Sequence, residues 1–405
     1  MDFLSLVLYL YSLFAGYFQG SATETEYNLN LLKNPSATCL DGSQGSYYWK
    51  SGTGNGTDRT LIYFQGGGWC YGSYDPETGA SESSMLDSCL YRSGTGLGSS
   101  KDYPQTKTFG GMLSTDATKN KLFANWNIAY QPYCDGVARS SDLDEPVEWK
   151  GKKLYFRGKS ILDSLIDELI ADRGLEKMSQ VVVAGCSAGG HTVYLHADYI
   201  KSRLPKNIEV LAVPDAGFFL DHLDYEGNPT YHEQMKTLFD YTKGISHLNS
   251  GCMEKFSSPD DAWKCIFPQY FVHEMETPVF PVQSQYDSWQ LGNILRIGCT
   301  PENCKGDELK AALAYKEATL SALDIKEFKS TDGIWSEACV MHCHTGGSLY
   351  YDPNWEVPEN SGYTAERAVR EWVTHSEPTE SSIHSDSVSY PGNSNCAKTS
   401  WDFVQ

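Results

Sequence analysis

The sequence predicts an α/β fold in which a mostly parallel sheet carries helices on both faces. Apolar or aromatic runs typical of buried strands occur at 60–65, 126–134, 208–217 and 278–289. A helical pattern at 158–173 separates the second run from the third. Strands that alternate with helices favour a parallel sheet covered on both sides. One large α/β domain with insertions can accommodate 405 residues, so we expect a single domain over 23–405.

The helix at 158–173 has the clearest pattern of these elements. Its apolar residues recur at the spacing of one helical face, and Gly174 follows where a C-terminal cap is expected. The strand at 60–65 stops at three consecutive glycines and therefore leads into a tight loop. The stretch from Cys70 to about Phe109 shows no regular period. We expect a long loop there that is functional or cross-linked.

Residues 1–22 are predicted to be a secretory signal peptide. An apolar run from Phe3 to about Phe18 is followed by small residues, with cleavage expected near Ala22. Asp2 stands where a signal usually carries Lys or Arg, so a retained anchor helix is the alternative, although the run is short for spanning a bilayer. We expect the rest of the chain to be soluble and located outside the cell or in the cell wall.

Twelve cysteines, an even number, favour disulfides formed in an oxidising compartment. Spacing suggests the pairs Cys252 with Cys265 and Cys299 with Cys304, and further candidates are Cys39 with Cys134 and Cys70 with Cys89. Cys396, beyond a Ser-rich tail, is expected to be tied back to the domain. The sequon at Asn55 agrees with a secreted glycoprotein.

The net charge of −20 argues against nucleic acid as a partner. No cluster of basic residues with interleaved aromatics offsets that charge. The same charge should weaken binding of an extended polyanion unless local groups compensate.

Residues 185–189, GCSAG, fit the G-x-S-x-G pattern of a nucleophile elbow. The elbow requires a strand before the serine and a helix after it, and VVVAG precedes while AGGHTVYLHADYI follows. We therefore interpret Ser187 as a nucleophile, the alternative being a tight turn that needs small side chains. Cys186 precedes the apex and is expected to point into the core rather than to act as a nucleophile.

A serine nucleophile needs a histidine base and an acid that orients the base. Asp287 follows the predicted strand at 278–289, where the carboxyl end of a parallel strand would face the site. Beyond it, His342 and His344 are both candidate bases, in a loop braced by Cys339 and Cys343. These four His and Cys residues could alternatively hold zinc, although their close spacing suits a tetrahedral ion poorly.

The oxyanion hole requires backbone N–H groups aimed at one point. Gly67, Gly68 and Trp69 follow a strand and resemble the Gly-rich loop that supplies one such donor. The N–H of Ala188, directly after the serine, would supply another.

Eight ordered motifs then resemble the pectin acetylesterase family, which includes the plant pectin acetylesterases and the animal carboxylesterase Notum. They are GGGWC, NWNIAYQPYCDG, YFRG, GCSAGG, DAGFFLD, FPQYF, YDSWQ and ACVMHC. The resemblance implies an α/β-hydrolase-like fold and a triad of Ser187, Asp287 and His342, because the family histidine follows a cysteine by three residues. It also places the oxyanion hole at Gly68, Trp69 and Ala188. Gln65 departs from the Glu usual in plant members.

The resemblance implies a secreted serine carboxylesterase that hydrolyses O-acetyl esters of pectin or a related cell-wall polysaccharide. We expect Trp69, Tyr71, Phe218 and Phe219 to bind substrate, with no metal or cofactor, and the chain to be a monomer. The alternatives are Notum-like removal of a fatty acyl group from a secreted protein and an inactive glycan-binding protein. From the net charge we expect methyl-esterified or neutral acetylated glycans, or short oligomers, to be preferred over unesterified polygalacturonate.

Overall fold

The computed structural model describes residues 25–258, 260–374, 382–390, 393, 394 and 396. The predicted signal peptide at 1–22 lies outside these residues. Among the described helices, none combines the length and the apolar character needed to cross a membrane.

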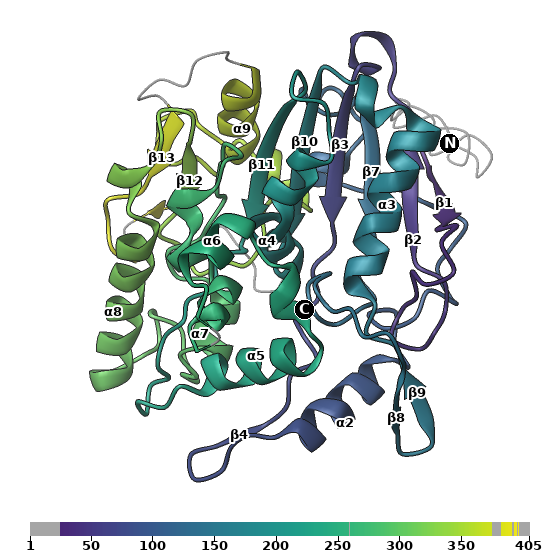
Figure 1. The fold of residues 1–405 in the computed structure, drawn as a ribbon. Coiled ribbons are helices and arrows are strands. Elements are labelled where there is room, and N and C mark those ends of the chain that lie inside the picture. Colours follow the sequence, from purple (N-terminus) through teal and green to yellow (C-terminus); the bar gives the residue numbers. More distant parts are fainter. Residues whose placement is uncertain (1–24, 259, 375–381, 391–392, 395, 397–405) are drawn as a thin grey trace, which may run out of the picture.

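A seven-stranded sheet forms the centre of the molecule, in the order β11-β10-β3-β7-β2-β1-β6 (Figure 1). Its strands are β1 (Tyr27–Leu31), β2 (Ser46–Lys50), β3 (Arg59–Phe64), β6 (Thr106–Lys107), β7 (Asn127–Gln131), β10 (Gln180–Cys186) and β11 (Glu209–Asp215). The four strands from β11 to β7 pair in parallel, whereas β2, β1 and β6 pair antiparallel at one edge. The predicted α/β-hydrolase-like sheet, parallel for its central part, is confirmed.

The strand order reverses next to β3. The chain passes from β3 to β7 on one side, then returns to β10 and β11 on the other. In open α/β sheets, the crevice outside the carboxyl ends of the strands at such a reversal is where ligands bind. The loops that follow β3 and β10 therefore lie at the position where a site is expected.

Helices cover both faces of the sheet. The helices α3 (Gly158–Arg173) and α4 (Ala188–Ser202) lie in front of it in Figure 1. Their apolar faces join a core that extends from Leu32 to Val340. A second core on the opposite face includes α9 (Ala365–Thr374), which contributes Ala368, Val369 and Trp372. α3 has the predicted bounds, and Gly174 caps it at φ 70°.

The remaining helices and short strands lie outside the seven-stranded sheet. They are α2 (Glu82–Arg92), α5 (Thr230–Tyr241), α6 (Ser250–Lys255), α7 (Ser288–Asn293), α8 (Gly306–Leu323), and the short strands β4 (Tyr74–Asp75), β5 (Gly79–Ala80), β8 (Val147–Trp149), β9 (Lys152–Leu154), β12 (Ile334–Ser336) and β13 (Ile383–Ser385). The presence of α2 corrects the expectation of a continuous loop between Cys70 and Phe109. Ser81 caps its start by accepting a hydrogen bond from the Ser84 N–H.

The predicted strand at 278–289 is not a regular strand. The segment runs parallel to β11, but only through two isolated bridges, Ala212 with Val279 and Asp215 with Val282. Pro278 and Pro281 carry no N–H, and proline inside a sheet removes a ladder hydrogen bond. The segment still delivers Asp287 to the carboxyl edge of the sheet, where its side chain caps the start of α7.

Six disulfides join all twelve cysteines. The four predicted pairs are confirmed, and Cys396 is tied back to Cys339. The sixth disulfide joins Cys186 to Cys343. Cys186 is half-buried and bonded, so it offers no thiol. Because Cys339 and Cys343 are both in disulfides, the alternative zinc site loses its sulfur ligands.

Candidate active site

Ser187 sits on a strained turn between β10 and α4. Its φ of 59° and ψ of −127° are unusual for a residue with a side chain. Such strain persists only where the surroundings hold it, and it is typical of a nucleophile elbow. The Ser187 N–H donates to the Asp215 carbonyl at 2.9 Å, and the Ser187 carbonyl accepts from the His191 N–H at 2.8 Å. The strand on one side and the helix on the other therefore fix the turn.

Glycines allow the backbone to close around the elbow. A Cβ on Gly66 would lie 2.7 Å from the Ser187 Cβ, and one on Gly189 would lie 2.0 Å from the Phe64 carbonyl oxygen. Neither position leaves space for a side chain. The loop after β3 therefore packs directly against the serine.

Asp287 and His342 form a hydrogen-bonded pair. The His342 Nδ1 lies 2.9 Å and 3.0 Å from the two carboxylate oxygens of Asp287. The carboxylate also accepts hydrogen bonds from the Gln290 N–H at 3.0 Å and from the Gln283 side-chain amide at 3.4 Å. Asp287 is almost completely buried. This network fixes the ring of His342 and leaves its Nε2 as the nitrogen able to take a proton.

The charge environment favours a protonated His342. Burial alone would lower its pKa, but the charge of Asp287, the hydrogen bond to Asp287 and the charge of Asp215 together raise the pKa above 6.5. The rings of Phe219 and Trp289 lie 6.4 Å and 6.5 Å from the imidazole. An imidazole held between a carboxylate and aromatic rings suits a general base whose imidazolium is stabilised.

His344, the other candidate base, lies in a different environment. It is 1% exposed; its Nε2 is 3.3 Å from a carboxylate oxygen of Glu337, and its Nδ1 is 4.0 Å from Asp215. Burial and, to a smaller extent, the charge of His342 lower its pKa to about 3. The structure thus brings His342, and not His344, together with Asp287.

Asp215 is a buried carboxylate that the sequence reasoning missed. One of its oxygens accepts three hydrogen bonds, from the His344 N–H and from the N–H and hydroxyl of Thr345. Burial raises its pKa to about 6, against these hydrogen bonds, which lower it. Its position at the carboxyl end of β11, beside the nucleophile strand, is the signal that could have identified it. Asp215 thereby ties the histidine loop to the sheet.

Arg92 holds the Gly-rich loop that is predicted to supply the oxyanion hole, and the sequence reasoning missed this residue too. Gly67 and Gly68 have φ values of 146° and 63°, which favour glycine. The Arg92 guanidinium, on α2, donates to the Gly67 carbonyl at 2.7 Å and to the Trp69 carbonyl at 3.1 Å. In a trans peptide the N–H of the next residue points opposite to the carbonyl, so the bond to the Gly67 carbonyl directs the Gly68 N–H away from Arg92. On the other side of Ser187, Ala188 opens α4 with an N–H that the helix does not use.

The aromatic residues predicted to bind substrate are largely buried. Trp69 is 4% exposed, and Phe218 and Phe219 are not exposed. The Trp69 ring contacts Phe219 at 4.8 Å and Trp289 at 5.6 Å. Phe218 packs on Tyr194, and Tyr71 is partly buried beside Tyr231. Trp69 and Phe219 therefore lie close to His342, whereas Phe218 packs against α4.

A family sequence model described as pectinacetylesterase matches residues 21–397. The chain belongs to the pectinacetylesterase family. Among its relatives, pectin acetylesterase 5 of Arabidopsis thaliana is 30% identical over 91% of this chain and 83% of its own length. Human palmitoleoyl-protein carboxylesterase NOTUM is 31% identical over 86% of this chain and 66% of its own length.

A crystal structure of the Wnt deacylase Notum from Drosophila shares the fold of this pectinacetylesterase family member. It matches with a TM-score of 0.72 at 24% identity, over 86% of this chain and 93% of that chain. The predicted family and fold are confirmed, and the chain is a carboxylic ester hydrolase. Membership of this enzyme family argues against the alternative of an inactive glycan-binding protein.

Proposed function

We propose that this chain is secreted and hydrolyses O-acetyl esters of pectin or a related cell-wall polysaccharide through an acyl-enzyme on Ser187. The observation that carries the proposal is the hydrogen bond between His342 and Asp287, together with the strained elbow at Ser187. The six disulfides agree with an oxidising, extracellular location, as does the exposed sequon at Asn55.

The arrangement supports acyl transfer in two steps. His342 Nε2 takes the hydroxyl proton as Ser187 Oγ attacks the ester carbonyl, and Asp287 stabilises the imidazolium that forms. The N–H groups of Gly68, Trp69 and Ala188 would bind the tetrahedral oxyanion. The proton then passes to the departing sugar hydroxyl. Water, activated by the same histidine, hydrolyses the acetyl-serine and regenerates the free hydroxyl.

Packing around Trp69 supports a small acyl group. Trp69, Phe219 and Trp289 contact one another edge to face at 4.8–5.6 Å, so their rings fill the space beside His342. A long acyl chain would have to displace these rings, whereas an acetyl group would not. Four of the relatives are named pectin acetylesterases, which agrees with this size.

The test compares acetate release from acetylated pectin by the wild-type chain, by Ser187→Ala and by a control, Ser202→Ala, at the exposed end of the same helix. Only Ser187→Ala should lose activity. An aryl-ester series from acetyl to palmitoyl then tests the acyl length. Rates that rise toward palmitoyl would replace the acetylesterase proposal with the Notum-like alternative.

A further inference from the structure

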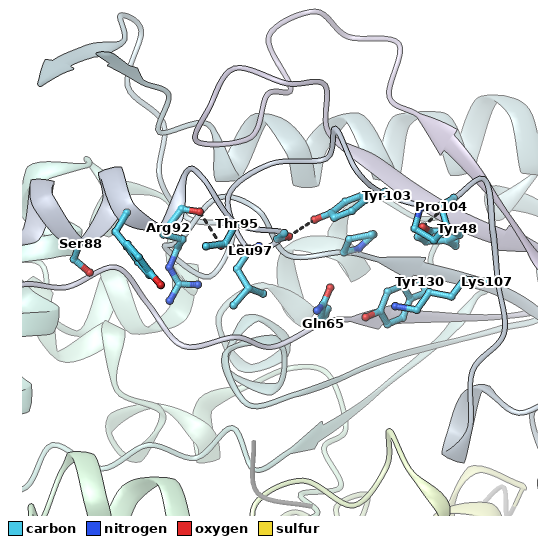
Figure 2. Close-up of a pocket in the computed structure, with 13 residues that line it drawn as sticks. Tyr48, Gln65, Ser88, Arg92, Thr95, Leu97, Tyr103, Pro104, Lys107 and Tyr130 are labelled. Carbon is cyan, nitrogen blue, oxygen red and sulfur yellow. Dashed lines mark hydrogen bonds between the residues drawn. The ribbon is translucent and has the colours of Figure 1, made fainter. Parts of the chain in front are cut away.

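A cavity of about 470 Å³ lies beside the oxyanion loop, within the usual range of about 300–1,000 Å³ for small-molecule sites. Its walls come from β2, β7, α2 and the loop that follows α2. In Figure 2, Gln65 lies between Leu97 and Tyr130, with Arg92 at one end and Lys107 at the other. The cavity is therefore elongated along the edge of the sheet.

Tyrosine rings make up much of the wall. They are Tyr48, Tyr91, Tyr103 and Tyr130. The Tyr48 hydroxyl donates to the Pro104 carbonyl at 2.8 Å and the Tyr103 hydroxyl donates to the Gly96 carbonyl at 2.7 Å, which fixes both rings (Figure 2). Tyr48 and Tyr130 are only 2% and 7% exposed, so the rings open to a ligand are those of Tyr91, which is 80% exposed, and of the half-buried Tyr103. Such rings can stack against the C–H faces of sugar rings.

The charge of the cavity is opposite to that of the chain. Arg92 and Lys107 line it, and no Asp or Glu is among the described residues of its wall, although the whole chain carries −20. The Lys107 ammonium lies 5.2 Å from the Phe109 ring centre and 5.9 Å from that of Tyr130. A concave wall with charges of one sign attracts the opposite charge. The cavity therefore favours an anion.

Two walls of the cavity continue into the catalytic loops. Gln65 precedes Gly66, which packs against Ser187, and Arg92 holds the carbonyls of Gly67 and Trp69. At the other wall, Tyr130 contacts Phe109 at 4.3 Å. The chain then reaches Met112, whose N–H donates to the Thr345 carbonyl of the histidine loop at 2.7 Å. Packed residues thus connect the cavity to both the elbow of Ser187 and the loop of His342.

We propose that this cavity binds a carboxylate-bearing sugar unit of the substrate, next to the unit whose acetyl ester is hydrolysed. The inference rests on the proposed function and deepens it. Lys107 pairs with the carboxylate while the accessible rings of Tyr91 and Tyr103 offer faces on which the sugar ring can stack. For short substrates this reverses the preference for neutral glycans expected from the net charge, because the local charge of the cavity acts at closer range.

The first experiment compares two acetylated oligogalacturonides, one with free carboxylates and one fully methyl-esterified, with each kcat/KM divided by that on 4-nitrophenyl acetate. The wild-type chain should prefer the free carboxylates at low salt. Lys107→Glu should reduce that preference roughly tenfold or more, because it replaces an attraction by a repulsion. Lys107→Arg should keep it, and high salt should weaken it in the wild-type chain.

The matched control is Lys310→Glu, which makes the same change of net charge on the exposed surface of α8. It should leave the preference unchanged. A wild-type preference for the methyl ester would overturn the proposal. Equal losses in Lys107→Glu and Lys310→Glu would also overturn it, because net charge and not the cavity would then set the preference.

A binding measurement separates this inference from the proposed function. Ser187→Ala is titrated calorimetrically with an oligogalacturonide that carries no acetyl group, with and without Lys107→Glu. Binding that Lys107→Glu weakens roughly tenfold supports the cavity even if no acetyl glycan is hydrolysed. Absent binding, or binding that Lys107→Glu leaves unchanged, rejects the cavity even if acetyl hydrolysis is established.

Discussion

The two halves of the candidate active site are held by different kinds of structure. Ser187 is fixed by regular backbone, since β10 and α4 meet at it and glycines close the turn. His342 lies in a loop without helix or strand, between β12 and the short 3-10 helix at Ser348–Tyr351. Side chains and disulfides from distant parts of the chain hold that loop: Asp287, Asp215 and Cys186. The serine half is thus a local structure and the histidine half an assembled one.

The largest effect should come from Asp287→Asn. The amide can still contact His342, but it cannot stabilise the imidazolium and it favours the wrong tautomer, so kcat should fall about 10⁴-fold. Unfolding by heat should change little by comparison. Asp287 raises the pKa of His342, so this pKa should fall in the variant. The acid limb of the remaining activity should therefore shift to lower pH than in the wild-type chain. Steady-state rates across pH check both expectations.

The double substitution Cys186→Ala with Cys343→Ala should have the next largest effect. This disulfide closes a loop of 157 residues, and chain entropy alone gives it about 5 kcal/mol. The same relation gives about 2 kcal/mol for the loop of 5 residues between Cys299 and Cys304. Chemical denaturation of both double variants measures the difference, and equal losses would contradict the comparison.

On the serine side, Gly189→Ala should destabilise the fold by about 1–3 kcal/mol. The added Cβ would lie 2.0 Å from the Phe64 carbonyl oxygen, which belongs to the sheet and cannot move alone. Gly292→Ala in α7 is the control, because nothing lies within 4 Å of its added Cβ. That substitution should be neutral or slightly stabilising. Thermal unfolding that ranks the two in the opposite order would reject the close packing of the elbow.

The smallest effect should be a pH shift in Asp215→Asn. The amide oxygen can keep accepting the bonds from His344 and Thr345, but the negative charge that raises the pKa of His342 is lost. The catalytic base must be neutral, so a lower pKa extends activity to lower pH. An acid limb of kcat/KM that stays in place would show that Asp215 acts on the loop only through hydrogen bonds.

The same contrast explains what the sequence could predict. The helix at 158–173, the strand before Ser187 and the loop after β3 follow from local periodicity and glycine placement, and the structure has them. Asp287 could be placed by chain order, although the segment before it pairs with β11 and β12 only through isolated bridges. From the residues alone, His342 and His344 were equivalent candidates, because both follow Asp287 in chain order and lie in the same cysteine-braced loop.

The missing information was long-range. Asp215 contacts Thr345 across 130 residues, and Cys186 and Cys343 are separated by 157. No local pattern marks such partners. Arg92 was missed for a related reason: only three residues of α2, Met85, Leu86 and Cys89, are buried, which is too weak a period to identify the helix that carries it.

The Cys186–Cys343 disulfide joins the residue before the proposed nucleophile to the residue after the proposed base. Oxidative maturation and assembly of the active site are then one event. We expect a newly made, still reduced chain to lack esterase activity, and activity to return in step with this cross-link during refolding. Mass spectrometry of the linked peptides, sampled alongside the rate, follows both. Full activity before the cross-link forms would show that the active site assembles independently of this disulfide.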